Sequence, residues 1–120
     1  MTEAQHQAAL MKWTQQAGVR AKYPELKFLF HVPNGGARNP IEGKHLKAAG
    51  VKRGVPDLML PVPRGVYHGL WIELKTDKGK ASPEQEWWIA ELRKNGYAAE
   101  VRRGWKEAVG LLVKYLEEQP

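Results

Sequence analysis

Cysteine is absent from the sequence, and this absence removes several kinds of chemistry at once. The chain has no disulfide framework, no thiolate zinc site and no cysteine nucleophile. No apolar run is long enough to cross a bilayer, and the first residues have neither the basic nor the apolar region of a signal peptide. We therefore expect a soluble protein of the cytoplasm that is not secreted and makes no contact with a membrane.

Acidic residues are also in short supply. The chain has 13 Asp and Glu against 19 Lys and Arg, which gives a formal net charge of +6 and a pI near 9.7. An acidic polymer is the expected partner, and nucleic acid ranks before a membrane because no basic amphipathic helix dominates. A chain of 120 residues can bury a single core, so we expect one domain over residues 1–120.

Two apolar segments carry the acidic residues of greatest interest. In segment 70–75, side chains alternate between two faces, and Glu73 shares its face with Lys75. A carboxylate in a strand apolar enough to be buried is costly unless it is paired or binds a metal. Asp57 opens the preceding apolar run, 58–60, so antiparallel pairing brings it beside Glu73. Two adjacent carboxylates repel unless a cation separates them, and oxygen ligands of this kind suit Mg²⁺ or Mn²⁺.

These residues carry a resemblance to a known superfamily. Pro56-Asp57 followed by Glu73-Leu74-Lys75 resembles the signature of the PD-(D/E)XK nucleases. The two-part acidic motif occurs by chance in many chains, whereas a longer run is much more specific. The longer run here resembles the VRR-NUC branch over nearly the whole chain, through Gly54-Val55-Pro56-Asp57-Leu58, Trp71-Ile72-Glu73-Leu74-Lys75, Ser82-Pro83-Glu84-Gln85 and Gly96-Tyr97.

The resemblance implies a metal-dependent DNA endonuclease. We expect Asp57, Glu73 and the carbonyl of Leu74 to hold Mg²⁺ or Mn²⁺, which activates water for phosphodiester hydrolysis. Lys75 would orient or polarise the nucleophile and offset the charge that grows in the transition state.

Two supporting residues have alternative roles. Residues 2–17 read as a helix that Gly18 ends, and its apolar stripe, projected backwards, reaches Glu3. Glu3 either reaches the metal site through a water or only complements the helix dipole. Gln85 occupies the capping-box position after Ser82, and it also leads the helical face that packs on the sheet. In the resembling family both Glu3 and Gln85 belong to the active site.

Basic and Gly-rich segments flank the predicted site. The loop over residues 33–40 lets backbone N–H groups approach a phosphate, although a tight surface turn is the commoner fate of Asn-Gly-Gly. Exposed basic residues usually form only a solvated face. Their position beside a phosphate-cutting site favours a grip on the DNA backbone. The residues predicted to contact DNA are Asn34, Gly35, Arg38, Lys52, Arg53, Lys78 and Lys80.

The expected elements define the fold class. Their order is a helix at 2–17, a strand at 26–32, a short helix at 41–49, two strands within 57–75, a helix from residue 83, a strand at 97–102 and a helix at 105–116. Without the short helix this matches the αβββαβ core of the PD-(D/E)XK, restriction-endonuclease-like fold, a mixed α/β sheet with an added C-terminal helix. The four histidines show no ligand-like spacing, and we expect each to be structural or solvated.

The resemblance also implies a class of DNA substrate and an oligomeric state. Stand-alone family members resemble phage and bacterial junction resolvases, so the expected substrate is branched DNA, of the four-way Holliday type, in a bacterial or phage-infected cell. Two sites acting on one junction require a homodimer across a two-fold axis. The apolar candidates for its surface are Trp105, Tyr115 and one of Trp87 or Trp88.

Two other functional classes remain as alternatives. One is a catalytically inactive DNA-binding or assembly protein with a nuclease fold, which would have no need of a buried acidic cluster. The other is a restriction-type endonuclease that reads a short sequence. Sequence readers generally carry extra elements for major-groove contacts, and this short chain leaves little beyond the core.

Overall fold

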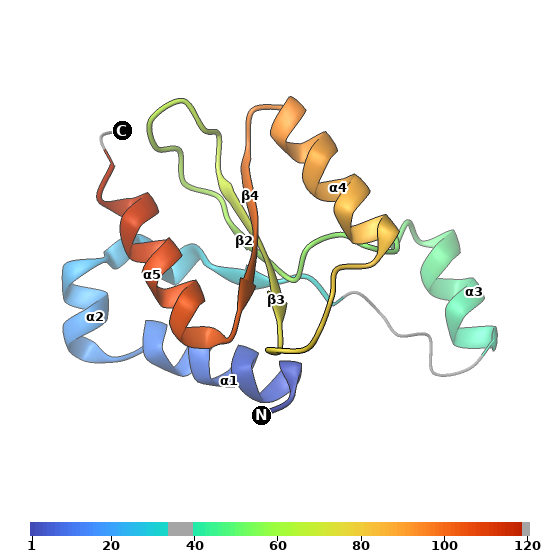
Figure 1. Ribbon diagram of the computed structural model, residues 1–120, viewed down its shortest axis with the longest axis horizontal. Helices are drawn as coiled ribbons and strands as arrows, with labels where there is room; N and C mark the ends of the chain where they lie inside the picture. The colour runs from blue at the N-terminus through green and yellow to red at the C-terminus, as the bar shows by residue number, and fades with distance from the viewer. Residues whose placement is uncertain (34–39, 119–120) are drawn as a thin grey trace.

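The computed structural model describes residues 1–33 and 40–118 (Figure 1). In chain order the elements are α1 (Glu3–Thr14), α2 (Ala17–Lys22), a 3₁₀ helix (Pro24–Phe28), β1 (Phe30–His31), α3 (Pro40–Ala48), β2 (Leu58–Leu60), β3 (Leu70–Lys75), α4 (Pro83–Lys94), β4 (Ala98–Arg103) and α5 (Trp105–Leu116). Without α2, the 3₁₀ helix and α3, this order is αβββαβ followed by α5. The predicted fold class is confirmed. Over the same described residues, no helix is both long and apolar enough to span a membrane.

The strands form one mixed sheet in the order β1-β2-β3-β4. β2 pairs antiparallel with both β1 and β3, and residues 61–69 form the hairpin loop that connects β2 to β3. β3 pairs with β4 in parallel, which requires a crossover, and α4 provides it. β3 therefore lies inside the sheet with a partner on each side.

Helices cover both faces of the sheet. α1 and α5 lie together over one face and α4 lies over the other (Figure 1). The larger core fills the first interface, where Leu10, Ile72 and Leu112 are all 0% exposed. The smaller core lies beneath α4, around Ile89 and Leu92. Because helices cover both faces, β3 is buried on both, and its alternating side chains enter two different environments.

The N-terminal region differs from the sequence prediction in two places. α1 ends at Thr14, and Gly18, which was predicted to end the helix, lies inside α2 instead. The side chain of Arg20 donates to the carbonyl of Thr14 at 3.0 Å, which satisfies a group at the end of α1. The strand predicted over 26–32 is wrong over most of its length. Pro24 begins a 3₁₀ helix, a position that suits a residue without an N–H, and strand pairing begins only at Phe30.

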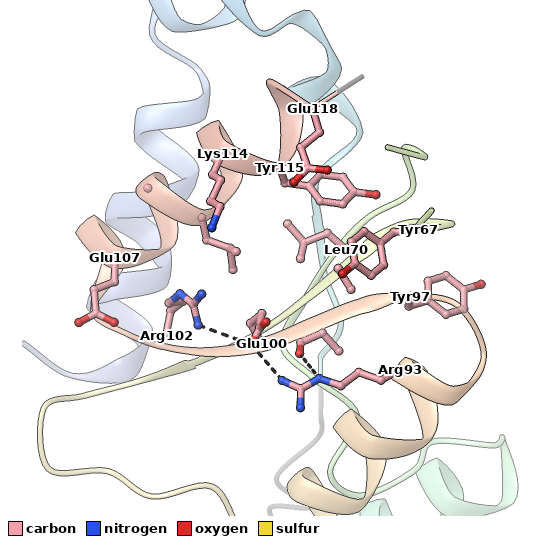
Figure 2. Close-up of a pocket in the computed structure, with 14 residues that line it drawn as sticks. Tyr67, Leu70, Arg93, Tyr97, Glu100, Arg102, Glu107, Lys114, Tyr115 and Glu118 are labelled. Atoms are coloured by element: carbon pink, nitrogen blue, oxygen red, sulfur yellow. Dashed lines mark hydrogen bonds and ion pairs between the residues drawn. The ribbon is translucent and has the colours of Figure 1, made fainter. Parts of the chain in front are cut away.

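The outer edge of the sheet is β4, and charged side chains cover it. Arg93 donates to the carbonyl of Ala99 at 2.9 Å, and Arg102 donates to that of Val101 at 2.8 Å. Glu100 pairs with both arginines, as Figure 2 shows in the cavity of about 640 Å³ between α4 and α5. Occupied carbonyls and surrounding charges discourage another strand from pairing at an edge.

Tyr115 links α5 to the connection between β2 and β3. It is 5% exposed, and its hydroxyl donates to the carbonyl of Val62 at 2.6 Å. Burial of the ring raises the pKa of Tyr115 above its ordinary value. Tyr115 was a sequence candidate for the dimer surface, and the structure corrects this, because the residue belongs to the core.

We expect Tyr115→Phe to lower the free energy of unfolding by about 1–2 kcal/mol, because the change leaves the buried carbonyl of Val62 without its donor. Urea denaturation followed by circular dichroism measures this. Tyr67→Phe is the matched control, since Tyr67 is 39% exposed. Equal stabilities for Tyr115→Phe and the wild type would show that the bond contributes nothing.

Candidate active site

The centre of the candidate site is an ion pair on β3. Glu73 is 0% exposed and Lys75 is 7% exposed, and Lys75 Nζ lies 3.5 Å from Glu73 Oε2. The same Nζ lies 3.9 Å from Glu3 Oε2, in the first turn of α1. A capping box between Thr2 and Gln5 begins that helix and fixes where Glu3 emerges. Segments far apart in the sequence thus place three charges together.

Asp57 joins the site from the start of β2. The pairing of Leu58 with Ile72, continued by one residue, puts Asp57 opposite Glu73. Asp57 Oδ2 accepts a hydrogen bond from the backbone N–H of Leu74 at 3.0 Å. The pairing that the sequence suggested for these two carboxylates is therefore the one that the fold adopts.

Two residues at the end of β1 hold the backbone of Asp57. The Asp57 carbonyl accepts a hydrogen bond from the N–H of Val32 at 2.7 Å and one from the ring of His31 at 2.9 Å. Because a carbonyl only accepts, His31 Nδ1 carries the proton in this contact. Sequence reasoning missed His31, since its role depends on the pairing of β1 with β2 and no local pattern marks it.

The three carboxylates form a set that fits a divalent cation. Glu3, Asp57 and Glu73 each offer an oxygen, and these atoms lie within 4.8 Å of one another. Glu73 Oε1 is buried and has no hydrogen-bond partner among residues 1–33 and 40–118. A buried carboxylate oxygen without a partner is costly, and a hard cation such as Mg²⁺ or Mn²⁺ would supply one. The N–H of Leu74 is bound to Asp57, and metal binding by its carbonyl stays a prediction.

Protonation of Glu73 reflects this environment. Burial and the negative charge of Asp57 raise the pKa of Glu73 to about 8, although the Lys75 ammonium acts in the opposite direction. The Glu73 carboxyl therefore retains its proton to a higher pH than an ordinary glutamate does. Metal ligands must be deprotonated, so cation binding and proton release are linked.

Gln85 combines the two roles that the sequence left open. Its Oε1 accepts from the N–H of Ser82 at 2.8 Å, and Ser82 Oγ accepts from the N–H of Gln85, which completes a capping box at α4. Its Nε2 donates to Glu73 Oε2 at 3.1 Å. Because the cap uses the amide oxygen, only the NH₂ group faces the carboxylate. The same side chain therefore begins α4 and orients Glu73.

The segment after β3 carries two of the predicted DNA contacts. Lys78 and Lys80 are exposed in the connection that leaves Lys75 and enters α4. Arg103, at the end of β4, holds this turn through donation to the carbonyls of Thr76 at 3.0 Å and Asp77 at 3.3 Å. Sequence reasoning missed Arg103 as well, because only the parallel pairing of β3 with β4 brings it to the turn.

The other predicted DNA contacts divide into two groups. Lys52 and Arg53 are exposed on the segment between α3 and β2, where the carbonyl of Arg53 accepts from Trp88 Nε1 at 2.9 Å. The second group, Asn34, Gly35 and Arg38, lies outside the described residues.

His6 follows Glu3 by one turn of α1 and serves the architecture. Its Nδ1 accepts from the backbone N–H of Trp105 at 3.1 Å, at the first residue of α5. Gly104, just before, has φ +84, and a Cβ there would lie 3.3 Å from the His6 ring. The structural role that the sequence suggested for the histidines is the one seen for His6.

The VRR-NUC domain family matches residues 1–105. The chain belongs to this family. A solved structure described as a VRR_NUC domain protein is similar to it, with 32% sequence identity and a TM-score of 0.83 over 99% of this chain and 91% of that chain. None of the curated proteins compared with the chain matches it. VRR-NUC domains belong to the PD-(D/E)XK superfamily, so the chain carries a nuclease-type domain with DNA as its class of substrate.

The pKa of Glu73 predicts a pH-dependent stability for this VRR-NUC domain. The folded-state pKa of about 8 lies above the ordinary value of 4.5, so the folded state binds the proton more tightly. The stability that this tighter proton binding by Glu73 gives the folded state is complete below pH 4.5 and is lost as the pH rises through 8. With chelator present, the stability of Glu73→Gln relative to the wild type should rise by a few kcal/mol across this range, at about 1.4 kcal/mol per pKa unit.

Urea denaturation at pH 5, 7 and 9 measures this effect. Glu86→Gln, the same change at an exposed position on α4, is the control and should follow the wild type. Parallel stability curves for the wild type and Glu73→Gln would show that Glu73 does not retain its proton in the folded protein.

Proposed function

We propose that this protein is a metal-dependent, structure-specific DNA endonuclease that hydrolyses phosphodiester bonds. One observation carries the proposal: Lys75 Nζ lies 3.5 Å from the buried Glu73, whose carboxylate shares a cluster with those of Asp57 and Glu3, with one oxygen from each within 4.8 Å of the others. A protein that only binds DNA gains nothing from burying a carboxylate with an unpartnered oxygen. A phosphodiesterase uses such a group to hold a cation against the phosphate.

The roles of the central residues follow from their contacts. Asp57, Glu73 and the carbonyl of Leu74 would hold Mg²⁺ or Mn²⁺. A bound cation of this kind lowers the pKa of water and stabilises charge on the phosphorane-like transition state. Lys75 carries only donors, so its ammonium would orient the nucleophile and offset the negative charge of the transition state.

Two residues support this centre. Gln85 donates to Glu73 Oε2, which holds the carboxyl plane and leaves Oε1 free to face a cation. The Glu3 side chain is 48% exposed at the rim, where solvent reaches it. That exposure suits contact through a water better than direct ligation of the metal.

Within this proposal the substrate is a four-way junction and the active form is a homodimer. To the αβββαβ core the described residues add only α2, the 3₁₀ helix, α3 and α5, which favours recognition of DNA shape over the reading of bases in the major groove. Resolution of a junction requires two sites related by a two-fold axis. Since Tyr115 is buried, Trp105 and Trp87 remain as apolar candidates for the dimer surface.

Cleavage assays test the catalytic proposal. A labelled four-way junction, a flap and a plain duplex are each incubated with Mg²⁺, Mn²⁺ or chelator. We expect paired symmetric cuts on the junction with either metal, and none with chelator. Asp57→Ala, Glu73→Ala and Lys75→Ala should each lower the rate by at least about 100-fold while circular dichroism shows a folded protein.

Glu86→Ala is the matched control, because it removes an exposed carboxylate from the same region. Full activity in one of the three variants would remove that residue from the scheme. Binding of the junction by the wild type without cleavage by either metal would overturn the catalytic proposal in favour of an inactive DNA-binding protein.

The salt dependence of binding tests the phosphate contacts separately. Lys80→Ala should weaken junction binding in chelator, and it should reduce the slope of log K against log salt by about one unit if one phosphate contact is lost. Lys94→Ala is the matched control. It removes the same charge at the C-terminal end of α4, a helix about 17 Å long that begins three residues after Lys80, and should leave the slope unchanged. An unchanged slope for Lys80→Ala would show that Lys80 does not contact a DNA phosphate.

A further inference from the structure

An open groove of about 630 Å³ lies beside the first turns of α4. Its lining combines two aromatic rings with a charged rim and consists of Lys52, Arg53, Pro83, Glu84, Trp87 and Trp88. The rim carries a net positive charge, because it contains two basic residues, Lys52 and Arg53, and one carboxylate, Glu84. Nothing in the catalytic scheme above uses the two aromatic rings.

The two tryptophans of the groove have different surroundings. The Trp88 ring is anchored, because its Nε1 donates to the carbonyl of Arg53 at 2.9 Å. The Trp87 ring meets Trp88 at an interplanar angle of 85°, with ring centroids 5.5 Å apart, and is 57% exposed. A fixed neighbour thus holds a large apolar ring in solvent beside two basic residues.

Close packing ties this groove to the candidate active site. Gly54 has φ +88, and a Cβ there would lie 2.6 Å from the backbone of Glu84, so the segment carrying the basic residues abuts the first turn of α4. Asp57 follows Gly54 by three residues, which span at most about 11 Å. On the other side, Glu84 adjoins Gln85, which contacts Glu73. The groove and the carboxylates therefore belong to one rigid neighbourhood.

We propose that this groove binds a nucleotide that leaves the base stack at the branch point of the DNA substrate, with the base stacked on Trp87 and the adjoining phosphate beside Lys52 and Arg53. An exposed indole accepts any base, because every base has a π face, and cations beside it follow the backbone. Bases inside a duplex are already stacked, and taking one out is least costly where it is unpaired. The groove therefore selects DNA with an interrupted stack near the cut site, and this deepens the endonuclease function proposed above, on which it rests.

Binding in chelator tests this proposal apart from catalysis. The probes are a duplex with a short single-stranded flap that carries 2-aminopurine, and the same duplex without the flap. Trp87→Ala should weaken flap binding by about 5- to 100-fold and change duplex binding by less than about 2-fold. The wild type should quench 2-aminopurine fluorescence and Trp87→Ala should not, while Trp87→Phe should restore most of the flap binding, because a phenyl ring also stacks on a base.

Tyr67→Ala is the matched control, since it removes another exposed aromatic ring, on the β2–β3 connection and outside the lining of the groove. Equal losses on flap and duplex, or no loss on either, would overturn the stacking proposal. A change from dimer to monomer in sedimentation of Trp87→Ala would overturn it in favour of a subunit contact. Selective flap binding that depends on Trp87, without cleavage in Mg²⁺ or Mn²⁺, would support the nucleotide-binding groove and overturn the endonuclease function.

Discussion

Burial of Glu73 inside the sheet is the constraint on which the rest of the site depends. A carboxylate with 0% exposure needs compensation from its neighbours. Lys75 supplies a charge and Gln85 a hydrogen bond, while Asp57 raises the cost by repulsion. The balance leaves one oxygen without a partner and a pKa of about 8, a state that a bound cation relieves. A bound cation would give Glu73 Oε1 a partner and would offset the repulsion between Glu73 and Asp57.

Two helix starts serve this one carboxylate cluster. α1 and α4 both begin with a capping box, and each contributes a side chain of its first turn, Glu3 and Gln85. Helix N-termini carry partial positive charge, which favours nearby carboxylates. The caps therefore do more than stabilise two helices, since they also fix the positions from which the two side chains reach β3.

The first turns of α4 lie between the candidate active site and the aromatic groove. Gln85 faces Glu73 from the first turn of α4, while Trp87 and Trp88 line the groove one turn further along. Contact of Gly54 with Glu84 joins the segment that leads to Asp57 to this turn. A nucleotide held in the groove would therefore lie close to the candidate site around Glu73.

Sequence alone determined those features that depend on local patterns. The alternation in 70–75, the capping box at Ser82 and the helix over 105–116 were all read correctly, because periodicity and capping act within one segment. The candidate catalytic residues came from a motif and its resemblance. Only the tertiary structure decided the short β1, the contact of His31 with Asp57, the anchoring by Arg103 and the exposure of Trp87. Each of these depends on strand register or packing between distant segments, which no local pattern encodes.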